Sequence, residues 1–229
     1  MTKEELLKTA KPILFNTDMV RAIFEGKSVT RRVVKGYIPK DAVFGYSGFT
    51  PSGHVSCRGT FEDGYGEKFF KLCYRKGDIL YVRETFQKFP NYKIGEYPTQ
   101  KNPNKKPDSW HYVYKADCFN LNEKWCPSIH MPKEAARIFL KVTDVRVEKL
   151  HDITDEQIIR EGISRDAVDH YMSQFPEAIE QYVHAAHFLP YAELWDSTIR
   201  KSELSLYGWE SDPWVWVIEF ERCEIQKEI

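Results

Sequence analysis

Apolar and polar residues alternate along several short stretches of the chain, and this pattern predicts five or six β-strands. The stretches are residues 11–15, 28–34, 79–84, 111–115, 137–148 and 214–225. A period of two residues is typical of strands, because successive side chains point to opposite faces of a sheet. In residues 79–84 both sets of side chains are apolar, which predicts a central strand that is covered on both faces.

Two helix starts stand out between these strands. Residues 19–24 place apolar side chains on one helical face, and a polar residue at 16–18 can cap the first turn. Thr154 and Gln157 have the spacing of a capping box, which predicts a second helix. Residues 164–203 show helical patterns without a strand signal. The chain therefore combines strands with helices.

The order of these elements favours an α+β fold. The regular helix crossovers of a parallel sheet are missing, so we expect a small, mostly antiparallel β-barrel decorated by helices. We expect a single domain over residues 1–229. Glycine, proline and helical patterns predict insertions in this domain at residues 35–76, 86–109 and 164–210.

Composition excludes a disordered tail. The chain has 229 residues, of which 42% are hydrophobic, with 33 Lys and Arg against 34 Asp and Glu. A chain of this length and apolar content can bury a core. Its apolar runs stay well short of the ~20 residues of a membrane span. The charged start MTKEELLKTAKP is unlike a signal peptide. We therefore expect a cytoplasmic protein without a membrane partner.

The cysteines predict neither disulfides nor a metal site. There are five, an odd number, and no two of them form a CxxC pair, which favours reduced thiols. His54 with Cys57 and Cys73, and Cys118 with Cys126, lack the paired short spacings of a zinc site. The sequence also lacks the P-loop, GxGxxG and GxSxG motifs. We expect no metal and no other cofactor.

Several separated blocks resemble the ASCH domain of the PUA-like superfamily. They are GKSVTRR at residues 26–32, the turn KGD at 76–78, a late helix that ends at Glu161, and the terminal strand WVIEF at 216–220. The stretches KPILFNTDMVRAI, GDILYVRET and PSIHMPKEAARI resemble the larger ASCH-type proteins of bacteriophages and prophages. The blocks cover about half of the chain, and the long insertions lie outside the minimal domain.

The resemblance implies a small β-barrel with a cleft for RNA or a modified nucleoside. In one branch of the family, the N4-acetylcytidine amidohydrolases, a lysine, a threonine and a distant glutamate hydrolyse the amide. These match Lys27, Thr30 and Glu161, and Arg32 matches the arginine that follows the threonine. The family usually places one residue between its glycine and this lysine, whereas here Gly26 precedes Lys27 directly.

Elementary chemistry also points to these three residues. A threonine hydroxyl is a poor nucleophile until a base takes its proton, and a lysine can be that base if burial or a nearby cation lowers its pKa. Arg31 and Arg32 supply such cations. Glu161 lies in the last turn of its helix, where the helix dipole favours the protonated form that a general acid needs. Alternatively, Lys27 and Thr30 are ordinary turn and strand residues, and Glu161 forms a surface ion pair.

Five residues are candidates for contact with the nucleic acid or nucleoside: Arg31, Arg32, Arg83, Glu84 and His130. Arg83 and Glu84 end a strand, where the arginine could face a phosphate or a base edge; the alternative is an internal ion pair. His130 precedes a strand and could frame the cleft, whereas most single histidines are simply hydrogen-bonded.

The expected partner is RNA or a modified nucleoside, and the sequence does not predict an oligomeric state. The 86–109 insertion interleaves five lysines with aromatic residues, a mixture typical of proteins that bind single-stranded nucleic acid. The alternative is a solvated loop. A pI of 6.7 argues against tight nonspecific binding to duplexes. A rival hypothesis is a phage protein that binds another protein through Trp209, Trp214 and Trp216, but we expect these side chains to be buried.

Overall fold

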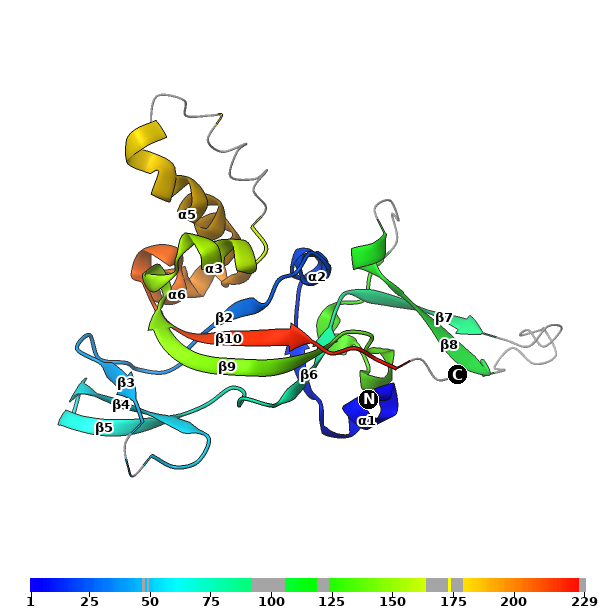
Figure 1. The fold of residues 1–229 in the computed structure, drawn as a ribbon, viewed down its shortest axis with the longest axis horizontal. Helices are drawn as coiled ribbons and strands as arrows, with labels where there is room; N and C mark the ends of the chain where they lie inside the picture. The colour runs from blue at the N-terminus through cyan, green and yellow to red at the C-terminus, as the bar shows by residue number, and fades with distance from the viewer. Residues whose placement is uncertain are drawn as a thin grey trace. The chain divides into compact units, whose positions relative to one another are not determined.

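The computed structural model describes residues 1–46, 48, 50–91, 106–118, 124–163, 173 and 179–226, except for the side chains of residues 179–187. The fold is a mixed α+β arrangement with more strand than helix (Figure 1). The chain divides into two compact units. The first consists of Met1–Phe24, Ile79–Leu140 and Cys223–Ile229, and the second of Glu25–Asp78 and Lys141–Arg222.

The first unit combines two short helices with a parallel strand pair and a hairpin. Its elements are α1 (Lys3–Thr9), β1 (Lys11–Leu14), α2 (Thr17–Phe24), β6 (Ile79–Arg83), β7 (Phe86–Asn91), β8 (Ser109–Tyr114), the 3-10 helices η1 (Lys115–Asp117), η2 (Ser128–His130) and η3 (Lys133–Ala135), and the start of β9. β1 and β6 are parallel, with Ile13 opposite Val82, and β7 and β8 are antiparallel. Leu6, Met131 and Phe139 are almost fully buried in the core of this unit.

The second unit contains two sheets and several helices. Its elements are β2 (Val29–Val33), β3 (Val43–Gly45), β4 (His54–Phe61), β5 (Gly64–Lys71), most of β9 (Phe139–Lys149), η4 (Leu150–Asp152), α3 (Asp155–Arg160), α5 (Ile179–Thr198), η6 (Lys201–Glu203), α6 (Leu204–Tyr207), η7 (Trp209–Ser211) and β10 (Trp214–Arg222). Here β9, β10 and β2 are neighbours in that order, and β3, β4 and β5 form a separate antiparallel sheet.

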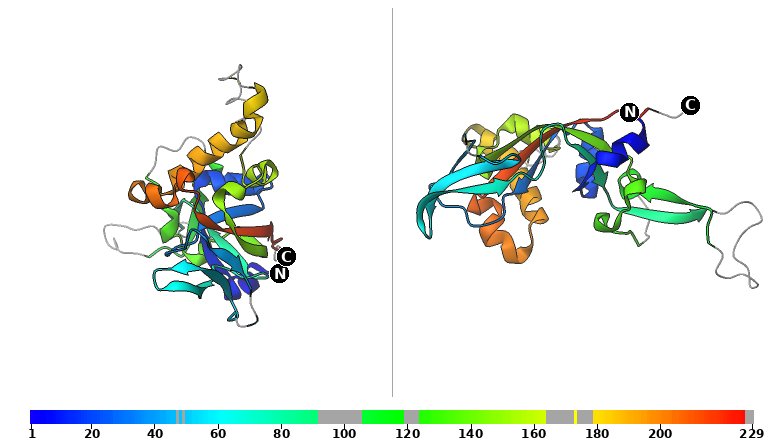
Figure 2. Two further views of the ribbon diagram at one scale, coloured as in Figure 1. Left: turned by 90° about the vertical axis from the view of Figure 1, so that its left-hand side faces the viewer. Right: turned by 90° about the horizontal axis from the view of Figure 1, so that it is seen from below.

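Helices cover one face of the β9, β10 and β2 strands (Figures 1 and 2). Val29 of β2 and Val217 of β10 are fully buried in a cluster with Ile158 of α3 and Trp195 of α5. These strand residues alternate with residues of the opposite face, because side chains in a strand alternate with a period of two. A second cluster, with Cys57 and partly buried Phe44, forms around the β3, β4 and β5 sheet.

Most of the predicted elements are confirmed. Strands occupy all six predicted stretches, to within a few residues at their ends. Asn16 caps α2, since its side chain accepts a hydrogen bond of 2.8 Å from the main-chain N–H of Met19. The capping box of Thr154 and Gln157 begins α3, and Gly162 follows the helix with a φ of 96° that favours glycine.

The predicted barrel is not confirmed. The strands of the described residues form open sheets that do not close on themselves. β1 lies at a sheet edge in the first unit because it pairs only with β6, and β2 lies at an edge in the second because it pairs only with β10. The 35–76 insertion folds into β3, β4 and β5. The single domain stays a prediction.

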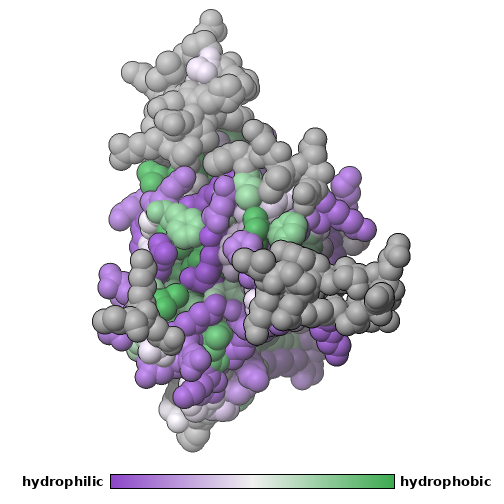
Figure 3. Space-filling view, turned by 90° about the vertical axis from the view of Figure 1, so that its right-hand side faces the viewer, coloured by the Kyte–Doolittle hydropathy of each residue, from purple (hydrophilic) through white to green (hydrophobic). Residues whose placement is uncertain are grey.

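The surface shown in Figure 3 is mixed in character. Hydrophobic residues lie as separate patches among hydrophilic ones on this face. Within the described ranges, helices are too short or too polar to cross a membrane.

Candidate functional site

The side chain of Lys27 lies against the end of helix α3 in the second unit. Its Nζ donates a hydrogen bond of 2.6 Å to the main-chain oxygen of Glu161, and only 7% of the residue is exposed. Gly26, immediately before it, has a φ of 103°, a conformation that residues with a side chain rarely adopt. The chain can therefore turn sharply just before Lys27 and direct this side chain inward.

Burial lowers the pKa of Lys27 from its usual 10.5 to about 8. The negative charge of Glu161 acts in the opposite direction, and the charges of Arg32 and Arg31 lower the pKa further. With a pKa of about 8, roughly a tenth of the Lys27 side chains are neutral at pH 7. This satisfies the chemical requirement for a lysine base: a free electron pair near neutral pH.

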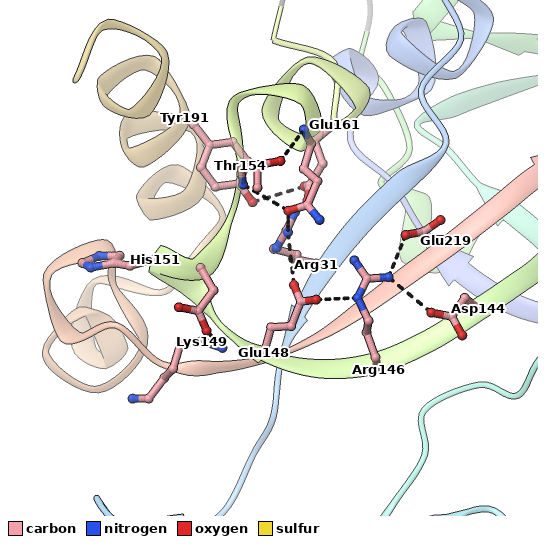
Figure 4. A network of polar contacts seen from close by, with 12 residues as sticks. Arg31, Asp144, Arg146, Glu148, Lys149, His151, Thr154, Glu161, Tyr191 and Glu219 are labelled. Carbon is pink, nitrogen blue, oxygen red and sulfur yellow. Dashed lines mark hydrogen bonds and ion pairs between the residues drawn. The ribbon is translucent and has the colours of Figure 1, made fainter. Parts of the chain in front are cut away.

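The carboxylate of Glu161 is held by two partners. Arg31 forms an ion pair with its Oε1, and Tyr191 of α5 donates a hydrogen bond of 3.2 Å to its Oε2 (Figure 4). Arg31 also donates a hydrogen bond of 2.7 Å to Gln157, and its side chain is fully buried. This ion pair is buried in the second unit, so it differs from the surface ion pair that was the alternative for Glu161.

Thr30 lies in β2 and is almost fully buried, opposite Ile218 of β10. Because neighbouring side chains in a strand point to opposite faces, Thr30 and Arg32 face away from the side on which Arg31 meets α3. The structure thus brings Lys27, Arg31 and Glu161 into one cluster, the Lys27 cluster. It places Thr30 and Arg32 on the other face of the same strand.

Arg32 is electrically coupled to the Lys27 cluster. Burial of the Arg32 side chain lowers its pKa, whereas the nearby Tyr74, Glu161 and Cys73 act to raise the pKa. An arginine remains protonated under such conditions, so Arg32 is a permanent cation beside the cluster. It is half-buried.

A network of charges continues from Arg31 across the helix-covered face of β9 and β10 (Figure 4). Glu148 Oε2 lies 3.6 Å from Arg31, and its Oε1 accepts a hydrogen bond from Arg146. Arg146 also donates a hydrogen bond of 2.6 Å to Glu219 and lies 3.3 Å from Asp144. This network was not among the predicted site residues, although charged residues at every second position of β9 were a signal for it in the sequence.

Arg83, Glu84 and His130 belong to the first unit and not to the Lys27 cluster. Arg83 donates a hydrogen bond to the main-chain oxygen of Ile129. Glu84 is almost fully buried and forms the internal ion pair that was its alternative, with two hydrogen bonds of 2.9 and 2.8 Å from Arg137. His130 is exposed in η2.

The three C-terminal tryptophans are buried or half-buried, as expected. Trp216 is 5% exposed, the ring of Trp214 lies 4.8 Å from that of Phe44, and the ring of Trp209 packs against that of His151. This burial does not favour a protein-binding surface built on them. In the 86–109 insertion, Lys88 lies over the ring of Trp110 at 4.5 Å, whereas Lys93, Lys101 and Lys105 lie outside the described residues.

The part of the chain that the structure describes contains no group of three or more His, Cys, Asp or Glu arranged to hold a metal ion. All five cysteines are free thiols. Burial raises the pKa of Cys57 to about 11, so this thiol is protonated at neutral pH and is a poor nucleophile.

Comparison with known proteins gives no match, whether with protein-family models, with curated proteins or with solved structures. The resemblance to the ASCH domain therefore stays a prediction.

Proposed function

We propose that the second unit is an amidohydrolase that acts on an N4-acylated, cytidine-like nucleoside, free or within RNA, as the resemblance to phage ASCH-type proteins implies. The observation that carries this proposal is the environment of Lys27: a buried amine, oriented by the main-chain oxygen of Glu161, with a pKa of about 8. Such an amine can take up and return a proton near neutral pH.

Lys27 acts as the base in this proposal and water as the nucleophile, because Thr30 faces the other side of β2. The neutral amine takes a proton from water while the water oxygen attacks the acyl carbon. The carbon–nitrogen bond then breaks, the acid leaves, and the Lys27 ammonium returns the proton to the N4 nitrogen.

Glu161 positions and tunes Lys27. Its main-chain oxygen fixes the direction of the amine, and its negative charge raises the pKa of Lys27 against the effect of burial. Arg31 and Tyr191 hold the carboxylate in place. The positive charge of Arg32 lowers the pKa of Lys27 and so favours the neutral amine.

The test is release of cytidine from N4-acetylcytidine by the purified protein, followed by chromatography. Lys27→Ala should lower the rate by about 10² to 10⁴-fold, the usual contribution of a general base. Lys35→Ala is the matched control, since Lys35 is exposed at the end of the same basic stretch. Equal release by wild type and Lys27→Ala, or no release by wild type, would refute the proposal.

A second candidate function is RNA binding without catalysis, and the β7 and β8 hairpin favours it. Trp110 is 44% exposed there, with the amine of Lys88 over its ring. A cation beside an exposed aromatic ring suits stacking of an unpaired base. Salt-dependent RNA binding that weakens when Lys101, Lys105 and Lys106 are neutralised, but not in Thr30→Ala, would support this function.

A further inference from the structure

Strand β5 is an outer strand of the β3, β4 and β5 sheet in the second unit (Figure 1). It has eight residues, whereas β3 at the opposite edge has three. Among the described residues, β4 is the one strand that pairs with β5. Bulges and prolines usually protect an edge strand from pairing with another strand. β5 contains no proline and pairs one to one with β4 along its whole length, so it lacks both devices.

The main chain of alternate β5 residues points away from β4. Leu72, one position beyond the strand, donates its main-chain N–H to Gly53 on the β4 side. In an antiparallel pair, residues that exchange hydrogen bonds with the neighbouring strand alternate with residues that do not. Tyr65, Phe69 and Lys71 are therefore in the set whose N–H and C=O groups point to the outer edge, where a further strand can bind them.

The side chains of these residues lie on the exposed face of the sheet. Tyr65 is 77% exposed and Phe69 is 41% exposed. Val43 of β3 belongs to the same face, because it lies opposite Arg58, which in turn lies opposite Glu67. Val43 is 67% exposed. Exposed apolar side chains beside an outer strand favour a partner that covers them.

The charges along β5 match a second copy of β5 in one register. Two copies can pair antiparallel about a two-fold axis, which places one residue opposite its own counterpart. With Glu67 or Lys68 on the axis, like charges face each other, which is unfavourable. With Phe69 on the axis, Glu67 of each copy faces Lys71 of the other, so two ion pairs form on the exposed face. Registers centred nearer either end of β5 pair fewer of its residues.

The contacts within one chain prepare these two ion pairs. Arg58 donates a hydrogen bond of 3.1 Å to Oε1 of Glu67, and Ser56 donates to the same oxygen. These bonds hold the carboxylate of Glu67 on the sheet, and a carboxylate can accept about four hydrogen bonds in all. Within the described ranges of a single chain, Lys71 forms no ion pair. Its exposed amine can therefore bind the carboxylate of a second copy.

We infer that β5 is a homodimer interface: two copies of the chain pair their β5 strands antiparallel about Phe69 and form one continuous sheet. The second copy is favoured over another protein because the charge pattern of β5 complements itself. The inference does not depend on the proposed function, since β5 contains no residue of the Lys27 cluster.

Sedimentation velocity of the full chain from about 1 μM to about 1 mM, the range of weak to moderate affinities, tests this interface. Lys71→Glu is the main variant. Lys68→Glu is the matched control, because it makes the same charge change on the same strand but faces Phe70 of the second copy. Phe69→Pro removes an outward N–H without taking a hydrogen bond from β4.

We expect wild type to sediment as the 27.0 kDa chain at low concentration and as a dimer at high concentration. Lys71→Glu should weaken the dimer about tenfold or more, because it places like charges opposite each other twice, and Lys68→Glu about twofold or less. Phe69→Pro should stay monomeric and keep the circular dichroism spectrum of wild type.

Four results would each overturn the inference. They are a wild type that is monomeric at every concentration, a dimer that Lys71→Glu does not weaken, equal weakening by Lys68→Glu, and a dimer of Phe69→Pro.

Discussion

The side-chain amine of Lys27 donates a hydrogen bond to the main-chain oxygen of Glu161 across 134 positions of the sequence. Glu161 caps the C-terminal end of α3, where main-chain oxygens have no partner within the helix. An amine can donate this bond both with and without its extra proton. The contact therefore fixes the position of Lys27 while leaving it free to exchange a proton.

Lys27 should make the stability of the protein depend on pH. Its pKa is about 8 in the folded protein and about 10.5 when exposed, so the unfolded chain binds more protons between these values. The free energy of unfolding of wild type, relative to Lys27→Met, should therefore rise as the pH increases from about 8 to about 10.5. The expected rise is on the order of 3 kcal/mol. Urea denaturation at several pH values measures it.

Lys35→Met provides the comparison, since Lys35 is exposed and lies eight positions further along the chain. The free energy of unfolding of Lys35→Met should change with pH in the same way as that of wild type. If Lys27→Met also changed with pH in the same way as wild type, the lowered pKa of Lys27 would be contradicted.

Arg31 should be essential for stability because Glu161 is only 6% exposed. Arg31→Met leaves this carboxylate buried without its cation, which typically costs about 3 to 5 kcal/mol. Glu161→Gln in the same chain removes the uncompensated charge, so the double variant should be more stable than Arg31→Met alone. Denaturation of the two single variants and the double variant measures their coupling.

An exposed pair in the same unit serves as the control. Arg58 and Glu67 also form an ion pair, but the Arg58 side chain is 53% exposed. Arg58→Met should cost at most about 1 kcal/mol. If Arg31→Met were no more destabilising than Arg58→Met, the buried ion pair would not contribute as proposed.

Arg137 should have a similar role in the first unit, with a pH dependence of its own. Burial raises the pKa of Glu84, and Arg137 opposes this effect. In Arg137→Met the folded protein should hold a proton on Glu84 at a pH where the unfolded chain has lost it. The free energy of unfolding of this variant should therefore fall as the pH rises above 4.5, with a loss of about 3 to 5 kcal/mol relative to wild type at pH 7.

Denaturation of wild type and Arg137→Met at pH 5 and pH 7 checks this sign. Asp117→Asn is the matched control, because the Asp117 side chain contacts the same arginine but is 49% exposed. It should cost about 1 kcal/mol or less. A loss in Arg137→Met that does not shrink toward pH 5 would contradict the role of Glu84.

Local features of the fold could be predicted from the sequence, whereas its long-range pairings could not. The alternation in residues 214–225 and the capping box at Thr154 depend only on neighbouring residues, and both appear in the structure. The parallel pairing of β1 with β6, which links residues far apart in the sequence, gave no local signal. The predicted barrel depended on such pairings. Helix α1 was missed, although Thr2 and Glu5 form a capping box.

The candidate site also combines features that could be predicted from the sequence with features that could not. Lys27, Thr30 and Glu161 came from the resemblance and from their chemical types, and the contact of Lys27 with Glu161 is present. The ion pair of Arg31 with Glu161 could not be predicted, because the sequence does not say which face of β2 meets α3.

The register of β2 against β10 decides which of two adjacent residues faces the helices and which faces the opposite side of the sheet. A shift by a single position would exchange Thr30 with Arg31, placing a bulky cation in the space of a small hydroxyl and leaving Glu161 without its counter-ion. Deleting or inserting one residue in 28–33 would therefore disrupt both faces at once. Changes of length in the turn between β4 and β5 would leave both faces intact.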